Sequence, residues 1–193
     1  EVSDIYNNPG FLSEIKIDDL TLNGENFGES NISANWNNEN EAILINASTQ
    51  TGEIKTIHLS GLYTPRDQSL DMDLQIDRLH LRLFRRYVEN IFADLNGLAS
   101  GKVKIDGNLK EPLLNGEMQF QKTSFGIDYL KTRYSFTSPV QIIDNVFAFN
   151  EVNIFDRLSN KAIVSGEIRN NHLRDFFFDL KINTSNYLFL DTR

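Results

Sequence analysis

Alternation of apolar and polar residues over positions 101–121 is the feature that most limits what this chain can fold into. The stretch GKVKIDGNLKEPLLNGEMQFQ reads as two strands separated by KEPL at 110–113. Because successive strand side chains point to opposite faces, the two halves form a ribbon with one apolar and one polar side. This pairing places Leu109 opposite Leu114, Gly107 opposite Gly116, Ile105 opposite Met118 and Val103 opposite Phe120.

The same period of two recurs along most of the chain. It is visible in SEIKIDD, EAILINAST, TIHLSGLYT and SLDMDLQID before the ribbon, and in NVFAFNEVNIFD, KAIVSGEIR and FFFDLKIN after it. Turn signals separate these runs, namely TGE at 51–53, TPRDQ at 64–68, DN at 144–145 and NN at 170–171. The sequence therefore predicts an all-β antiparallel meander.

One segment does not follow this period-two alternation. FRRYVENIFADL (84–95) spaces its apolar residues as a helix does, and the following NG at 96–97 can end a helix. The spacing predicts a single short amphipathic helix over 84–95.

The chain also contains a repeat. Residues 59–81 and 164–190 share the order apolar-Ser-Gly, loop, apolar strand, Asp-Leu-x-Ile and a short apolar strand. Repetition at a fixed spacing is typical of stacked sheet units. We therefore expect one continuous domain over 1–193, built of two related units at about 1–83 and 97–193 and joined by the helix 84–95.

The composition excludes several classes of partner. The chain of 193 residues has a net charge of −8, whereas nucleic-acid binding depends on clustered lysine and arginine. The same charge disfavours docking on an anionic lipid surface.

The chain has no cysteine, hence neither disulfides nor thiolate chemistry. No apolar run reaches the roughly 18 residues of a membrane-spanning helix. If the parent protein is exported or anchored, we expect those segments outside this chain.

No arrangement of residues indicates an enzyme. His58, His80 and His172 lie on separate segments, whereas a catalytic or metal site needs partners that converge. The aspartates of LDMDLQID (70–77) alternate with apolar residues and lack the glycine and distal glutamate of a calcium loop. We therefore expect no enzymatic activity, no cofactor and no metal site.

A fixed order of glycine, proline and aspartate signals runs through LNGLASGKVKIDGNLKEPLLNGEMQF (95–120), YLKTRYSF (129–136), NVFAFNEVNIFD (145–156) and residues 162–192. The positions are Gly97, Gly101, Gly107, Pro112, Gly116, Asp156 and Gly166. This order resembles the carboxy-terminal part of the TamB family, the translocation and assembly module proteins of the AsmA-like envelope group. Residues 15–49 resemble the preceding module. The loop DRLSNKA from Asp156 departs from the pattern because it lacks the usual glycine.

The resemblance implies a long sheet curled into a half-open trough, or β-taco, with an apolar inner surface. Members of the family span the periplasm between the two membranes and are anchored in the inner membrane by an amino-terminal segment. The resemblance implies that this chain is a fragment without that anchor. They work with an outer-membrane barrel assembly protein of the TamA type. The expected function is a periplasmic hydrophobic groove that conducts phospholipid between the membranes and supports outer-membrane biogenesis and protein secretion.

The residues themselves leave two arrangements of the apolar side open. The sheet can close on a second sheet as a dry sandwich, or it can stay open as a trough for acyl chains. Glycines on the apolar side, such as Gly61 and Gly166, remove bulk where a sheet bends and favour the trough. An open trough must be filled, because large exposed apolar patches are rare. The helix 84–95, a lipid or detergent, or a second copy through self-association could each fill it.

The candidate groove-lining residues are the apolar members of the strands after the predicted helix. They are Val103, Ile105, Leu109, Leu114, Met118, Phe120, Tyr134, Phe136, Phe147, Phe149, Val164, Ile168, Phe176, Phe178, Leu180 and Ile182. Ile105→Asp is expected to block lipid passage, whereas Lys104→Asp on the polar side is not. The alternative function is a chaperone or scaffold that captures outer-membrane protein strands at a sheet edge by β-augmentation, which a proline in that edge would disrupt.

Overall fold

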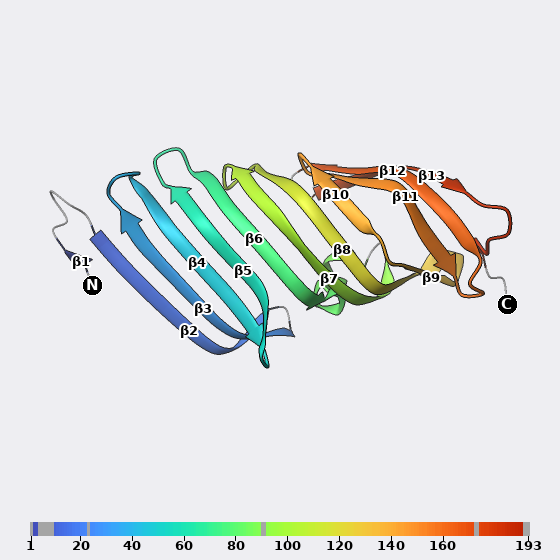
Figure 1. Ribbon diagram of the computed structural model, residues 1–193, viewed down its shortest axis with the longest axis horizontal. Helices are drawn as coiled ribbons and strands as arrows, with labels where there is room; N and C mark the ends of the chain where they lie inside the picture. Colours follow the sequence, from blue (N-terminus) through green and yellow to red (C-terminus); the bar gives the residue numbers. More distant parts are fainter. Residues whose placement is uncertain (1, 4–9, 23, 90–91, 172–173, 191–193) are drawn as a thin grey trace. The chain divides into compact units, whose positions relative to one another are not determined.

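The chain is extended β-structure almost throughout (Figure 1). The computed structural model describes residues 2–3, 10–22, 24–89, 92–171 and 174–190. Its strands are β1 (Val2–Ser3), β2 (Gly10–Leu22), β3 (Glu25–Asn37), β4 (Ala42–Thr51), β5 (Ile54–Thr64), β6 (Ser69–His80), β7 (Ala93–Gly107), β8 (Pro112–Ile127), β9 (Thr132–Phe136), β10 (Pro139–Ile143), β11 (Val146–Asp156), β12 (Lys161–Asn171) and β13 (Arg174–Asn183).

The strands follow one another in the sheet in chain order, from β1 to β8 and then from β10 to β13. Neighbouring strands pair antiparallel, as in β3 with β4 and β11 with β12. The prediction of an all-β antiparallel meander is therefore confirmed. The turns predicted at 51–53, 64–68 and 144–145 separate β4 from β5, β5 from β6 and β10 from β11, whereas Asn170 and Asn171 still belong to β12.

β9 and β10 form one interrupted strand between β8 and β11. β9 pairs with Thr123–Ile127 of β8, and β10 pairs with Gly116–Gln119 of the same strand. The chain between them, Thr137 and Ser138, leaves the ladder. β11 continues the pattern, since it pairs with β10 at one end and with β9 at the other.

Contacts divide the chain into two compact units. Unit 1 is Glu1–Asp77 with Lys102–Asn115, and unit 2 is Arg78–Gly101 with Gly116–Arg193. The boundary passes through β6, β7 and β8, so each unit holds one part of these strands. The predicted repeat at about 1–83 and 97–193 stays a prediction.

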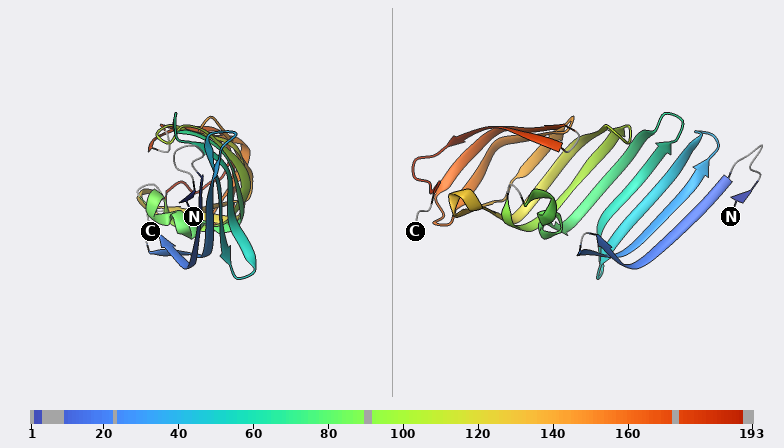
Figure 2. Two further views of the ribbon diagram at one scale, coloured as in Figure 1. Left: turned by 90° about the vertical axis from the view of Figure 1, so that its left-hand side faces the viewer. Right: turned by 180° about the vertical axis from the view of Figure 1, so that it is seen from behind.

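The helix predicted over 84–95 is wrong in extent. The 3-10 helix η1 (Leu81–Phe84) leads into α1 (Arg85–Val88), and the chain is extended again from Ala93 (Figure 2). Ile91 lies outside the described residues. The segment is drawn into the sheet because Ala93, Leu95, Gly97 and Ala99 also satisfy a period of two, and Ala93 lies next to Gly126 of β8. Leu81 and Leu83 are buried and anchor the helical turn.

The ribbon at 101–121 forms, but with its turn nearer the N-terminus than predicted. The turn lies between Gly107 and Pro112, so Leu109 sits in it and is 56% exposed. A Cβ built on Gly101 would lie 2.7 Å from Sδ of Met118, so Met118 cannot lie opposite Ile105. Because the shift is by an even number of residues, each strand keeps its predicted apolar side.

Candidate functional site: an apolar face on each unit

Unit 1 carries rows of apolar side chains that run across its strands. Residues directly opposite in an antiparallel pair share a face. The pairing aligns Ile15, Ile32, Ala47, Leu59 and Leu74 in one row across β2 to β6. Neighbouring rows on the same side are Trp36, Ile43, Tyr63 and Leu70, then Ala34, Ile45, Gly61 and Met72, and then Ile17, Ser30, Thr49, Ile57 and Ile76. We call this side the apolar face of unit 1.

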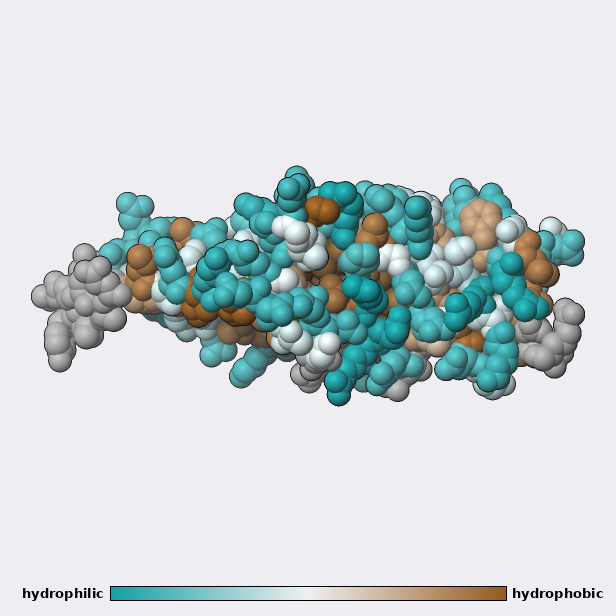
Figure 3. Space-filling model, turned by 90° about the horizontal axis from the view of Figure 1, so that it is seen from below, coloured by the Kyte–Doolittle hydropathy of each residue, from teal (hydrophilic) through white to brown (hydrophobic). Residues whose placement is uncertain are grey.

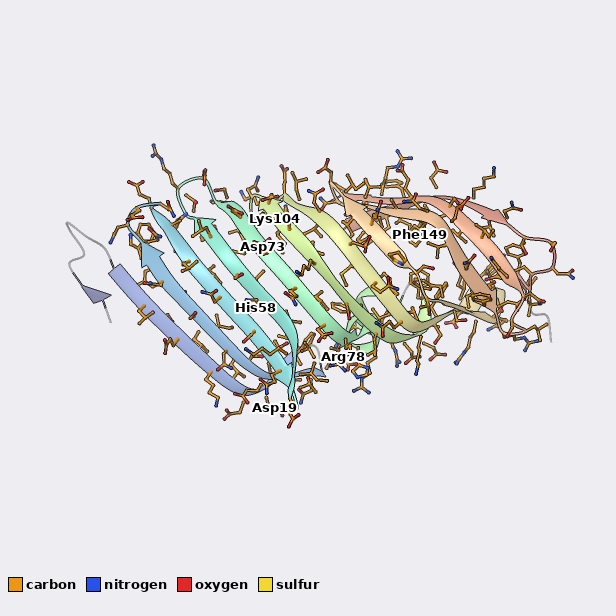
Figure 4. All side chains as sticks on the ribbon, viewed as in Figure 1. Asp19, His58, Asp73, Arg78, Lys104 and Phe149 are labelled. Atoms are coloured by element: carbon orange, nitrogen blue, oxygen red, sulfur yellow. The ribbon has the colours of Figure 1, made fainter. Side chains whose placement is uncertain are left out.

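The opposite side of unit 1 is mainly polar, and we call it the polar face, although its row Leu12, Asn35, Leu44, Leu62 and Asp71 contains three leucines. One of its rows is Glu14, Ser33, Asn46, Ser60 and Asp73, and the next is Lys16, Asn31, Ser48, His58 and Gln75. Lys104 of β7 forms ion pairs with Asp71 and Asp73 of β6 on this side. Figure 4 shows His58, Asp73 and Lys104 on three successive strands. His58 and the aspartates of β6 that alternate with apolar residues lie on this polar face, and His172 lies outside the described residues.

The apolar face of unit 1 is not sealed. None of the side chains in the row from Ile15 to Leu74 is buried, and Ile15 itself is 50% exposed. Of the other apolar members of the rows named, only Met72 is buried. Figure 3 shows hydrophobic residues exposed between hydrophilic ones on the side seen from below. A dry sandwich core would bury such residues almost completely.

The predicted lining residues of unit 1 lie mostly on this apolar face. Since Lys104 belongs to the polar face, its neighbours Val103 and Ile105 point to the other side. Val103 is buried, and Ile105 and Leu114 are half-buried. Leu109 is the exception, because it lies in the turn rather than in a strand.

Unit 2 has its own apolar face, on which the remaining predicted residues gather. One row runs Gly116, Ile142, Phe147, Ile168 and Phe178, and the next contains Phe149, Gly166 and Leu180. Val164 lies opposite Ile182, and Met118 lies opposite Val140. Phe176 has the same strand parity as Phe178. Phe178 and Ile182 of β13 are 49% and 47% exposed.

Bulges in β8 and β11 change the strand parity of unit 2, and the predicted lining residues do not include those directly beyond them. In β8, Lys122 has φ of +49°, and after it Thr123 and Phe125 occupy the face that Met118 and Phe120 hold before it. In β11, the register shifts between Phe149 and Val152, next to Glu151 with φ of +51°. An extra residue of this kind turns the rest of the strand over.

The result is a cluster of aromatic rings at the β8–β9 end of unit 2. Phe125 contacts Phe92, Tyr134 and Phe136, with ring centroids 4.9, 5.7 and 6.2 Å away. Phe136 also lies 5.3 Å from Phe120. Phe120, Tyr134 and Phe136 were predicted as lining residues; Phe92 had been assigned to the helix, and Phe125 carried no usable signal because of the bulge before it.

The segment 184–190, which we call the C-terminal strap, returns to this cluster. Tyr187 stacks on Tyr134 with the rings 5.4 Å apart and 4° from parallel, and Phe189 packs edge-on against Tyr187 at 5.3 Å. The hydroxyl of Tyr134 donates toward the carbonyl oxygens of Leu188 and Phe189, each 3.2 Å away. Burial raises the pKa of Tyr134 and of Tyr187, so both phenols are neutral at ordinary pH.

Asp156 joins the strap to the end of β11. Its carboxylate accepts hydrogen bonds from the backbone N–H groups of Leu158, Asn160 and Leu188 and from the side-chain amide of Asn160, at 2.8–2.9 Å. Burial raises the pKa of this carboxyl, but the hydrogen bonds from Asn160 and Leu188 outweigh it and lower the pKa below its ordinary value. Ser159, with φ of +65°, takes the left-handed conformation in the loop that follows Asp156.

Neither a metal cluster nor a spanning helix is found in the described part of the chain. No group of three or more His, Cys, Asp or Glu side chains could hold a metal ion among these residues. Likewise, no helix within them is long and apolar enough to cross a membrane.

No protein-family model, no curated protein and no solved structure matches the chain.

Proposed function

We propose that this chain is a periplasmic segment of a TamB-type protein and that its apolar face is a groove for phospholipid acyl chains. The observation that carries the proposal is the unburied apolar row from Ile15 to Leu74, which lies back to back with a polar row on the same strands. A sheet with one apolar side open to the surroundings needs an apolar occupant. Acyl chains supply that occupant without any cofactor or nucleotide.

The proposed shape is a half-open trough. Support comes from the irregular positions of the strands, because bulges bend and twist a sheet. Register shifts occur between β2 and β3, β4 and β5, β11 and β12, and β12 and β13. Gly61 and Gly166 lie so close to the next strand that a Cβ would meet a backbone oxygen at 2.2 Å, which lets the strands approach where a larger residue would hold them apart.

The energy of the proposed contact is sufficient to hold a lipid. Each buried methylene contributes about 0.8 kcal/mol, so a tail of ~15 methylenes gains on the order of 12 kcal/mol in a well-fitting groove. A succession of similar rows offers many positions of nearly equal energy, and a chain can therefore slide between them. In the proposed setting the groove conducts phospholipid between the inner and outer membranes with a TamA-type barrel protein as partner, and supports outer-membrane biogenesis.

Native mass spectrometry of the purified chain tests the proposal. We expect co-purified phospholipid on the unmodified chain and its loss in Ile105→Asp. Lys104 is a poor site for the polar control, because its ion pairs with Asp71 and Asp73 would be replaced by repulsion. Lys102→Asp is the better control, since Lys102 is exposed and has the parity of Lys104. Equal lipid occupancy in both variants would contradict the assignment of faces.

A chaperone or scaffold that captures strands is the second candidate, and the outer strand β13 favours it. Among the described residues, β13 pairs with β12 alone. It exposes Phe176, Phe177 and Phe178, of which Phe177 is 65% exposed on the side away from the apolar face. An exposed apolar edge invites another strand to pair.

A charge on this edge separates the two candidates. Phe177→Lys discourages edge pairing while the apolar face stays intact. Under strand capture, this variant no longer prevents the aggregation of an outer-membrane barrel precursor diluted from urea, as followed by light scattering. Under the groove proposal, it keeps its lipid.

A further inference from the structure

The strap is attached to unit 2 by few contacts. It forms no strand. Its hydrogen bonds to unit 2 are the Asp156–Leu188 bond, the two carbonyl contacts of Tyr134 and a bond from the Thr184 hydroxyl to the Lys161 carbonyl at 3.0 Å, and Tyr187 also stacks on Tyr134. Phe189 and Leu190 are 45% and 51% exposed. Segments with few buried contacts and exposed backbone open at low free energy. The strap can therefore leave its position while the sheet beneath it stays folded.

The strap lies where the apolar face of unit 2 is closed. Tyr134 is 5% exposed, and the nearby residues of the same face, Val152, Ala162 and Val164, are 1–3% exposed. Farther along the face, Phe178 of β13 is 49% exposed. Val140 and Ile142, which lie on the same face farther from the strap, are also buried, so the exposed part of this face is on the outer strand β13 and the strap covers its Tyr134 end.

The contacts of the strap combine an apolar filling with a dedicated anchor. The ring of Tyr187 covers Tyr134 of the apolar face, and Phe189 packs against Tyr187, so the strap places apolar surface where an acyl chain would lie. A carboxylate on such a face is costly unless its acceptor positions are filled. Asp156 is 4% exposed and accepts from Leu158, Asn160 and the strap residue Leu188, which makes it a fixed attachment point for the strap.

We propose that the strap 184–190 is an intramolecular gate that occupies the Tyr134 end of the apolar face of unit 2 and is displaced by an acyl chain entering that end. The inference rests on the proposed lipid groove. It adds that the groove is closed at the Tyr134 end of unit 2 and that the strap closes it. Lipid and strap then compete for one surface, so loosening the strap strengthens lipid binding there.

Hydrogen–deuterium exchange of the whole chain measures both partners of this competition. The probe is monomeric dioctanoyl phosphatidylethanolamine, and mass spectrometry follows exchange in 184–190 and in the strands of unit 1. We expect the lipid to slow exchange in β4 and β5 and to speed exchange in the strap by roughly tenfold. Tyr134→Phe removes the hydroxyl bonds but keeps the ring, and is expected to raise lipid affinity about fivefold, which corresponds to ~1 kcal/mol.

Two further variants keep the test independent of folding defects. Tyr187→Ala weakens the strap from its own side, and it is expected to act in the same direction as Tyr134→Phe. Tyr129→Phe is the matched control, because Tyr129 is 90% exposed in η2 (Asp128–Leu130) and outside the cluster. This variant is expected to leave both exchange and affinity unchanged.

The outcomes separate the gate from the groove. Protection of β4 and β5 by lipid, with unchanged or slower exchange in the strap, overturns the gate and leaves the groove standing. Unchanged affinity in both Tyr134→Phe and Tyr187→Ala also overturns the gate. Absence of lipid protection in unit 1 overturns the proposed groove, and the gate with it.

Discussion

Exchanging one side chain in the central apolar row tests the groove most directly. Leu59 lies in the row from Ile15 to Leu74, between Ala47 of β4 and Leu74 of β6. Leu59→Gln puts an amide on the apolar face, and His58→Gln puts the same amide one residue away on the polar face. Since neighbouring strands are ~4.8 Å apart, the row is on the order of 19 Å long, enough to carry most of an acyl chain.

The expected loss follows from the length of chain that one side chain supports. If Leu59 contacts about three methylenes, losing that contact costs ~2.4 kcal/mol, which weakens binding roughly fiftyfold. Titration calorimetry with monomeric dioctanoyl phosphatidylethanolamine measures the affinity, and circular dichroism confirms that both variants are folded. His58→Gln is expected to bind as the unmodified chain does. Similar losses in the two folded variants would refute the argument that strand parity selects the lipid-binding side.

Three further predictions concern the free energy of unfolding, measured with urea. Gly61→Ala is expected to lower it by about 3 kcal/mol, because the added Cβ would lie 2.2 Å from a backbone oxygen. Gly24→Ala is the control: it has open space around it and is expected to lower the free energy of unfolding by about 1 kcal/mol. A smaller loss at Gly61 than at Gly24 would contradict the close approach of the strands. Thr123→Val is expected to be neutral or to stabilise by ~1 kcal/mol, since the Thr123 hydroxyl is buried without a hydrogen-bond partner in the described structure; a clear loss would mean that this hydroxyl is satisfied. Because hydrogen bonds lower the pKa of Asp156, its contribution to stability is complete above the ordinary value of 3.8 and is lost as the pH falls through the lowered pKa. Urea unfolding near neutral pH and near pH 3 should show this loss, and Asp156→Asn should reduce it; an equal loss in the variant would assign the effect to other carboxyl groups.

Strand parity was predictable wherever a strand is regular. Tyr134 and Phe136 lie in the short, regular strand β9, where counting by twos puts both rings on one side of the sheet, next to the ring of Phe125. Phe125 lies beyond the bulge at Lys122, where a lysine takes a positive φ that is uncommon for its type. Nothing in the local sequence marks that residue as the extra one, so counting by twos places Phe125 on the wrong side.

The turn of the ribbon at 101–121 could have been placed better. Its side-chain signal is Asn108, whose amide oxygen accepts from the backbone N–H groups of Lys110 and Glu111 at 2.9 and 3.1 Å. Asparagine commonly closes a turn in this way. Pro112 was interpreted as part of the turn, whereas it begins β8, a position where its missing N–H is tolerated.

The extent of the helix was decided by tertiary pairing. Helical spacing over 84–95 and a period of two from Ala93 onward both fit the sequence. Pairing with β8 fills backbone hydrogen bonds along β7, and Arg133 forms an ion pair with Asp94. Longer-range contacts of this kind override local preference, and they were not visible in the sequence.

The chain-order pairing of β2 to β5 in unit 1 also bears on how this part assembles. Each of these strands bonds to the strand made just before or just after it, so the contacts join residues that are close in the chain. Low contact order speeds folding, and nearest-neighbour stabilisation lets structure spread one hairpin at a time. Unit 1 can therefore gain ordered strands in succession during synthesis, long before its last residues are available.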